Sequence, residues 1–174
     1  AAFGHNSLTN STSGGSNSGF GQDSGKNIIS GSFNTVIGRK SGFDISSGEN
    51  NVSLGFNAGD NISTNSNNTF IGSNTVGGNT TNASVLGYGV TSQGSNTVTL
   101  GNTDITDIYM AQDSGATIHA ADLNLGGTAV TATATEINYL DGVTSNVQTQ
   151  IDALSSSASS SVTEAFDEVL DTAA

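Results

Sequence analysis

The sequence predicts a mainly β protein: a β-solenoid, or β-roll, of 14–17-residue repeats, followed by a small β element and a C-terminal coiled-coil helix. Three observations lead to this prediction: a fixed period over the first hundred residues, a composition poor in bulky apolar residues, and a heptad pattern near the end. The predicted parts are a repeat shaft over residues 1–103, a short β element over 104–127, a linker over 128–144 and a coiled-coil helix over 145–171.

The period appears as an apolar residue followed by glycine, spaced by 17 residues four times and then by 15 and 14. The apolar residues of these pairs are Phe3, Phe20, Ile37, Leu54, Ile71, Leu86 and Leu100. Other positions keep the 17-residue spacing, among them Asn17, Asn34, Asn51, Asn68 and Ile28, Ile45, Ile62. Such a period is the signature of a solenoid, in which each unit buries its apolar face only against its neighbours.

Each repeat is expected to hold a short apolar strand, such as residues 35–37, between glycine-rich and asparagine-rich corners. Stacking the repeats at about 4.8 Å should place the seven apolar residues that precede glycine in one inward column, the core. Repeated asparagines should adopt the left-handed conformation or hydrogen-bond between turns through stacked amides. The sequence is compatible with two arrangements: each chain forms its own solenoid, or three chains wind around one common axis.

The composition excludes an ordinary single core, because only 33% of the residues are hydrophobic and 23 are glycine. Without cysteine there is no disulfide or thiolate metal site, so stability should come from stacking and subunit contacts. The apolar runs are too short for membrane insertion, and residues 1–20 lack the pattern of a signal peptide. A start in mid-repeat without Met is typical of a fragment or a processed product.

The charge is strongly acidic and unevenly distributed, with a net charge of −12 for the whole chain. Residues 1–100 carry all three bases against four acids, whereas residues 101–174 carry eleven acids and no base. Such a chain repels phosphate backbones, so no nucleic acid is expected among its partners.

Beyond Gly101 the period stops, and two different patterns follow. Residues 104–110 and 116–125 alternate as strands, with residues 112–115 as the turn, which predicts a β-hairpin or a small trimeric β element. From residue 145 to 171 a heptad seam with one stutter predicts a coiled coil. The seam residues are Val147, Ile151, Leu154, Ala158, Val162, Ala165 and Val169. Serine-rich positions 155–161 would leave a single helix marginal, so association of chains should stabilise it.

Few residues are candidates for a chemical site. His5 and His119 have no further ligand at a zinc spacing, and no Gly-x-Ser-x-Gly elbow occurs. We therefore expect no catalytic, cofactor-binding or metal-binding residue and no enzyme activity. One alternative is that acids between residues 104 and 122 converge on a threefold axis and hold Ca²⁺. Because their spacing matches no calcium loop, solvated surface acids are the favoured reading of Asp104, Asp107, Asp113 and Asp122.

Thr131, Thr133 and Thr135 form a Thr-x-Thr-x-Thr series, which some ice-binding solenoids use as a flat array. Threonine is also simply a good strand former, and this is the favoured reading.

The repeats resemble those of two families over roughly residues 1–103. Residues 84–87 and 96–101 resemble the head repeats of trimeric autotransporter adhesins. The longer units, such as residues 34–38 and 68–72, resemble the repeats of phage tail fibres that often precede an endosialidase-type chaperone domain. Residues 131–144 resemble a linker motif of tail fibres of marine phages, which favours the second family.

In both families such repeats are carried by homotrimers, so the resemblance implies a β-solenoid in a homotrimer with a C-terminal trimeric coiled-coil helix. It further implies a structural subunit of an elongated homotrimeric virion fibre, a phage tail fibre shaft used in host attachment. Its partners would be two further copies of the chain, other virion or fibre proteins at its ends, and host surface glycans or proteins. Its location would be the virion or an extracellular surface. The alternatives are a bacterial trimeric autotransporter-type adhesin head and stalk, and a depolymerase fibre. The depolymerase would need a carboxylate pair in a carbohydrate groove, for which no motif is present.

Overall fold

The computed structural model describes residues 1–112, 115–139, 143 and 146–172, with side chains up to residue 164. The chain divides into two compact units, Ala1–Ser114 and Gly115–Ala174, and each is described by itself.

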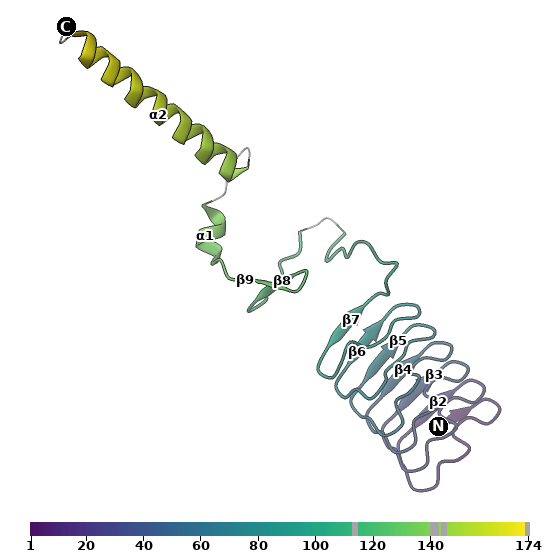
Figure 1. Cartoon of the computed structure of the whole chain (residues 1–174). Coiled ribbons are helices and arrows are strands. Elements are labelled where there is room, and N and C mark those ends of the chain that lie inside the picture. The colour runs from purple at the N-terminus through teal and green to yellow at the C-terminus, as the bar shows by residue number, and fades with distance from the viewer. Residues whose placement is uncertain (113–114, 140–142, 144–145, 173–174) are drawn as a thin grey trace. The chain divides into compact units, whose positions relative to one another are not determined.

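The first unit is a parallel β-solenoid of about six turns with a repeat of about 17 residues, as the sequence predicts (Figure 1). Its strands pair in sequence order, and each lies in register with the strand one turn later, so that Phe20 is opposite Ile37 and Ile37 is opposite Leu54. The seven strands are β1 (Ala2–Phe3), β2 (Ser18–Phe20), β3 (Thr35–Ile37), β4 (Val52–Leu54), β5 (Thr69–Ile71), β6 (Ser84–Leu86) and β7 (Val98–Leu100). Because successive turns of one chain pair with each other, each chain winds its own solenoid.

The core differs from the predicted one. In β2 to β6 the middle residue is buried and the third is exposed, because successive side chains of a strand point to opposite faces. Val36 is fully buried, whereas its neighbour Ile37 is 39% exposed. The predicted inward column is therefore wrong: Phe3, Phe20, Ile37, Leu54, Ile71, Leu86 and Leu100 lie on the outer face of the sheet. The core consists instead of Ile28, Val36, Ile45, Ile62, Phe70, Val85 and Val90.

The narrow interior explains this arrangement. The periodic isoleucines Ile28, Ile45 and Ile62 point inward from the turns and leave room for only one residue of each strand. Around Phe70 the space is already full, since a Cβ on Gly77 would lie 2.7 Å from the ring. The register places small residues beside large ones, as with Ser53 beside Phe70.

A buried asparagine ladder joins the turns along one side of the solenoid, as expected from the repeated asparagines. The side-chain nitrogen of Asn34 donates to Asn17 Oδ1 at 3.1 Å and to the Gly48 carbonyl at 2.8 Å. The backbone nitrogen of Asn34 also donates to Asn17 Oδ1, at 2.9 Å. Asn51 repeats all three contacts, with the Asn65 carbonyl as acceptor, and Asn68 repeats the two to the preceding asparagine. The ladder ends where the Ala83 nitrogen donates to Asn68 Oδ1. A different set of asparagines adopts the left-handed conformation at the corners, for example Asn57 with φ of 52°.

The second unit contains a β-hairpin at a different place from the predicted one. Strands β8 (Leu123–Leu125) and β9 (Thr128–Val130) pair antiparallel around Gly126 and Gly127, whose φ angles are 58° and 86°. Two central residues with positive φ suit the right-handed twist of a two-residue hairpin. A hairpin after the solenoid is therefore confirmed, but its predicted bounds of 104–110 and 116–125 are not: residues 104–112 and 115–122 form no strand, and only residues 123–125 of the second predicted strand belong to the hairpin. Part of its predicted turn, residues 113–114, lies outside the described residues.

Helix α1 (Ala134–Asn138) lies within the segment that was predicted to be a linker. A capping box begins it: the Glu136 nitrogen donates to Thr133 Oγ1 at 3.2 Å, and the Thr133 nitrogen donates to Glu136 Oε2 at 2.7 Å. The hydrogen bonds from the Thr133 backbone and side chain lower the pKa of Glu136. Since Thr133 caps this helix and Thr135 lies inside it, the threonine series forms no flat strand array.

Helix α2 (Val147–Thr172) confirms the predicted C-terminal helix. Its seam residues Val147, Ile151, Leu154 and Val162 are all exposed in the single chain. The side chains of Ala165 and Val169 lie outside the described part of the structure. Among the described residues, no helix combines the length and hydrophobicity that crossing a bilayer requires.

Candidate functional site

The outer face of the solenoid's sheet carries a line of large apolar side chains, one from each strand. We call this line the apolar ribbon; it consists of Phe3, Phe20, Ile37, Leu54, Ile71, Leu86 and Leu100. Their exposed fractions range from 38% to 64%. The strand register stacks each member on the next, and the rings of Phe3 and Phe20 are parallel with centroids 5.2 Å apart. Large contiguous apolar patches on a folded protein indicate an interaction surface.

The glycine that follows each ribbon residue explains why the ribbon is straight. Gly38 has φ of 124°, a conformation that side chains with a Cβ rarely adopt, and it lies directly against the backbone of Gly55 in the next turn. The chain therefore leaves every strand at the same point and in the same direction. This keeps the residue before the glycine at the same edge of the sheet from turn to turn.

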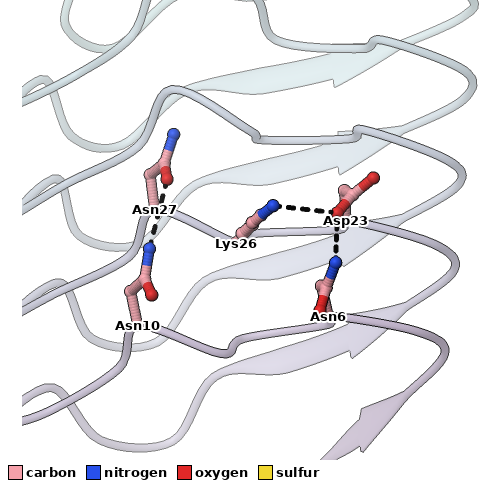
Figure 2. A network of polar contacts seen from close by, with 5 residues as sticks. All are labelled: Asn6, Asn10, Asp23, Lys26 and Asn27. Carbon is pink, nitrogen blue, oxygen red and sulfur yellow. Dashed lines mark hydrogen bonds and ion pairs between the residues drawn. The ribbon is translucent and has the colours of Figure 1, made fainter.

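A polar network joins the first two turns on the corner that follows the strands (Figure 2). Asp23 accepts a hydrogen bond from Asn6 Nδ2 at 3.1 Å and forms an ion pair with Lys26, whose Nζ lies 3.3 Å from the same oxygen. These contacts, led by the Asn6 hydrogen bond, hold the pKa of Asp23 below its usual value. Asn10 Nδ2 donates to Asn27 Oδ1 at 3.3 Å and adds a second tie between the same turns.

Two carboxyl groups meet on the same side of the solenoid one repeat further on. A hydrogen bond with Asp44, together with burial and the repulsion between the two charges, raises the pKa of Asp60. The Asn61 backbone nitrogen donates to Asp44 Oδ2 at 3.2 Å. The pair can share one proton, and the Asn61 side-chain nitrogen donates to Asp60 Oδ2 at 3.5 Å. Within the described parts of the chain, no three His, Cys, Asp or Glu side chains come together in a way that could hold a metal ion.

The acids and histidines considered from the sequence are dispersed. His5 and His119 are exposed, and so are Asp104, Asp107 and Asp122. The contacts of these acids are local, such as the Thr106 hydroxyl donating to Asp107 Oδ2 at 2.8 Å. Asp113 lies outside the described residues.

Sequence reasoning missed two cation–ring pairs that start from adjacent residues, Arg39 with Phe56 and Lys40 with Phe43; we call these four residues the Arg39 cluster. The guanidinium carbon of Arg39 lies 5.4 Å from the centroid of the Phe56 ring, and Lys40 Nζ lies 5.6 Å from that of Phe43. The signal in the sequence was Lys40, which stands at a position that the neighbouring turns fill with Asp23 and Asn57. The position of Arg39 varies from turn to turn and gave no signal.

No protein-family model, curated protein or solved structure matches the chain. The resemblances to tail fibres and to adhesin heads therefore rest on the sequence motifs alone.

Proposed function

We propose that the chain is a structural subunit of an elongated homotrimeric virion fibre, a phage tail fibre shaft used in host attachment. The observation that supports this proposal best is the apolar ribbon on the outer face of the sheet. In a single chain the ribbon stays in contact with water, at a cost that grows with its apolar area. Contact with further copies of the chain would remove that cost.

The shape of the ribbon favours copies of the same chain as its partners. Seven strands that stack at about 4.8 Å make a straight line of roughly 30 Å, which a parallel copy can match turn for turn. A closed arrangement around an axis parallel to the stack hides the ribbon of every subunit and leaves no edge for further addition. Serine and threonine at the outward first positions of β2, β3, β5 and β6 would lie beside the apolar contacts.

Helix α2 supports the association of parallel chains, and the number three comes from the tail-fibre resemblance. Its exposed seam of Val147, Ile151 and Leu154 follows the spacing of a coiled coil, and an isolated helix with this serine content is marginal. Three helices that associate would align three solenoids in the same direction. Together with the tail-fibre resemblance, this makes a trimer the proposed state.

A purely structural role also agrees with the arrangement of the acids. A retaining glycosidase needs its two carboxyl groups about 5 Å apart, on either side of the bond that is cleaved. Asp44 and Asp60 instead interact with each other strongly enough to raise the pKa of Asp60, which is typical of two carboxyl groups that share a proton. We therefore propose no enzyme activity for this chain, and a location on the virion or on an extracellular surface.

Immunoelectron microscopy tests the fibre role directly. An antibody raised against residues 1–103 should label thin fibres on purified virus particles from the organism that encodes this chain. Labelling of bacterial cell surfaces without particles would favour the adhesin head instead. Labelling of neither structure would refute the proposal.

A further inference from the structure

The Arg39 cluster contains two cations that form no ion pair with any acid whose side chain the structure describes. The chain has 15 acids and three bases, so an ion pair would be easy to form. Among the described side chains, however, the one ion pair is that of Lys26 with Asp23. Arg39 and Lys40 lie over the rings of Phe56 and Phe43.

The nearby acids are occupied by other partners. Asp23 contacts Asn6 and Lys26, while Asp44 accepts from the Asn61 nitrogen and shares a hydrogen bond with Asp60. The charges of Arg39 and Lys40 therefore remain available to a ligand from solution. A ring beneath a cation limits its movement and leaves its N–H donors directed outward, which lowers the entropy cost of binding.

The backbone at Lys40 departs from the rule of the repeat. This corner position is left-handed in every turn, and the other turns fill it with Asn6, Asp23, Asn57, Asn74 and Gly89, residue types that tolerate positive φ. Lys40 adopts φ of 57° at the same position. A lysine there costs stability that an asparagine would not, and strained positions of this kind are enriched at functional sites.

We propose that the Arg39 cluster binds an acidic polysaccharide, an inference that rests on the proposed role in host attachment and specifies its ligand. The guanidinium group of Arg39 can pair with a carboxylate or sulfate through two parallel N–H donors, and Lys40 adds a second charge on the next residue. The half-exposed Phe56 ring offers an apolar surface beside them for the C–H face of a sugar. In a trimer, three such sites would engage one repeating polymer and raise its affinity through multivalency.

Binding is tested with the full chain and three polymers: alginate, which carries carboxylates, dextran sulfate, and neutral dextran. Isothermal titration at low ionic strength should detect binding of at least one acidic polymer, weakening as salt is added, and none of neutral dextran. The acidic polymer that binds with the higher affinity identifies the preferred anion, carboxylate or sulfate. Absence of binding to both, or equal binding of neutral dextran, would overturn the proposal.

The repeat itself supplies matched variants. Arg39→Gln and Lys40→Asn restore the residues of the neighbouring turns, so both should fold, and Lys40→Asn should raise the melting temperature. Each should weaken binding roughly tenfold or more through the loss of a charge-assisted contact. The control is Lys26→Gln, which removes one positive charge from the Lys26–Asp23 ion pair, outside the Arg39 cluster. Equal weakening by Lys26→Gln, or no weakening by the other two variants, would refute a specific site.

Light scattering on the same samples separates this inference from the fibre proposal. A trimer that binds neither acidic polymer would exclude the polysaccharide site and leave the fibre standing. A monomer that binds alginate through Arg39 would support the site and exclude the trimer.

Discussion

Phe70 and Ile71 are neighbours in β5, and mutating each of them tests which face of the sheet is the core. Phe70 is fully buried, and the Gly77 backbone beside it and Ser53 on the preceding turn have little side chain with which to fill a hole. Phe70→Ala should therefore cost about 3–5 kcal/mol, the range for emptying a well-packed site. Ile71 is 38% exposed, and Ile71→Ala should cost about 1 kcal/mol or less in a dissociated chain.

Urea unfolding, followed by the β signal in circular dichroism, measures both values. The measurement is made at a series of protein concentrations, because association adds stability that depends on concentration. We expect the loss at Phe70 to be the same throughout, and the loss at Ile71 to grow with concentration as the ribbon becomes buried. Equal losses for the two variants at the lowest concentration would show that the assignment of the faces is wrong.

Three further perturbations have defined outcomes. Because the pKa of Asp60 is raised in the folded chain, the stability that its protonated form contributes is present at low pH and is lost as the pH rises through the folded-state pKa. Asp60→Asn keeps a neutral hydrogen-bond partner for Asp44 at every pH. This variant should therefore raise the melting temperature at pH 7 and change it little at pH 3. The Ser53 hydroxyl is buried without a hydrogen-bond partner, so Ser53→Ala should stabilise the chain by about 1 kcal/mol; a loss of stability in urea unfolding would contradict this. Replacing Ile151 and Leu154 together by Ser should abolish the helical signal in circular dichroism and leave most of the β signal, whereas an intact helix would show that the seam is misassigned.

The period of 17 residues was sufficient to predict the solenoid, because each turn must repeat the backbone path of the previous one to keep its strand paired. The same period could not identify the core, since every position of a repeat recurs with it. The uniformly apolar position before glycine suggested the interior. In the structure the interior is instead filled by the middle residues of the strands, such as Val36 and Phe70, which vary more from turn to turn, and by the isoleucines of the turns. Burial follows the alternation along each strand, and three-residue strands give too few positions to establish that alternation from sequence.

Features outside the repeat were partly visible in the sequence. The Thr133-Ala134-Thr135-Glu136 segment matches a capping box and could have predicted α1 within the proposed linker. Gly126-Gly127 likewise suits a two-residue hairpin turn, and it was overlooked in favour of the polar residues 112–115. In the Arg39 cluster, the contact of Arg39 with Phe56 joins different turns, so only the departure from the repeat at Lys40 pointed to the cluster.

The most direct test of the proposed fibre is the mass of the chain in solution, measured by multi-angle light scattering for the natural sequence and for a variant with Ile37→Ser, Leu54→Ser and Ile71→Ser. The natural chain should have three times the 17.4 kDa mass of one subunit. The variant should lose the trimer or weaken it severely, while its β signal in circular dichroism persists, because the three side chains lie outside the core. A monomeric natural chain, or a variant that remains as firmly trimeric, would contradict the proposal that the apolar ribbon joins three chains.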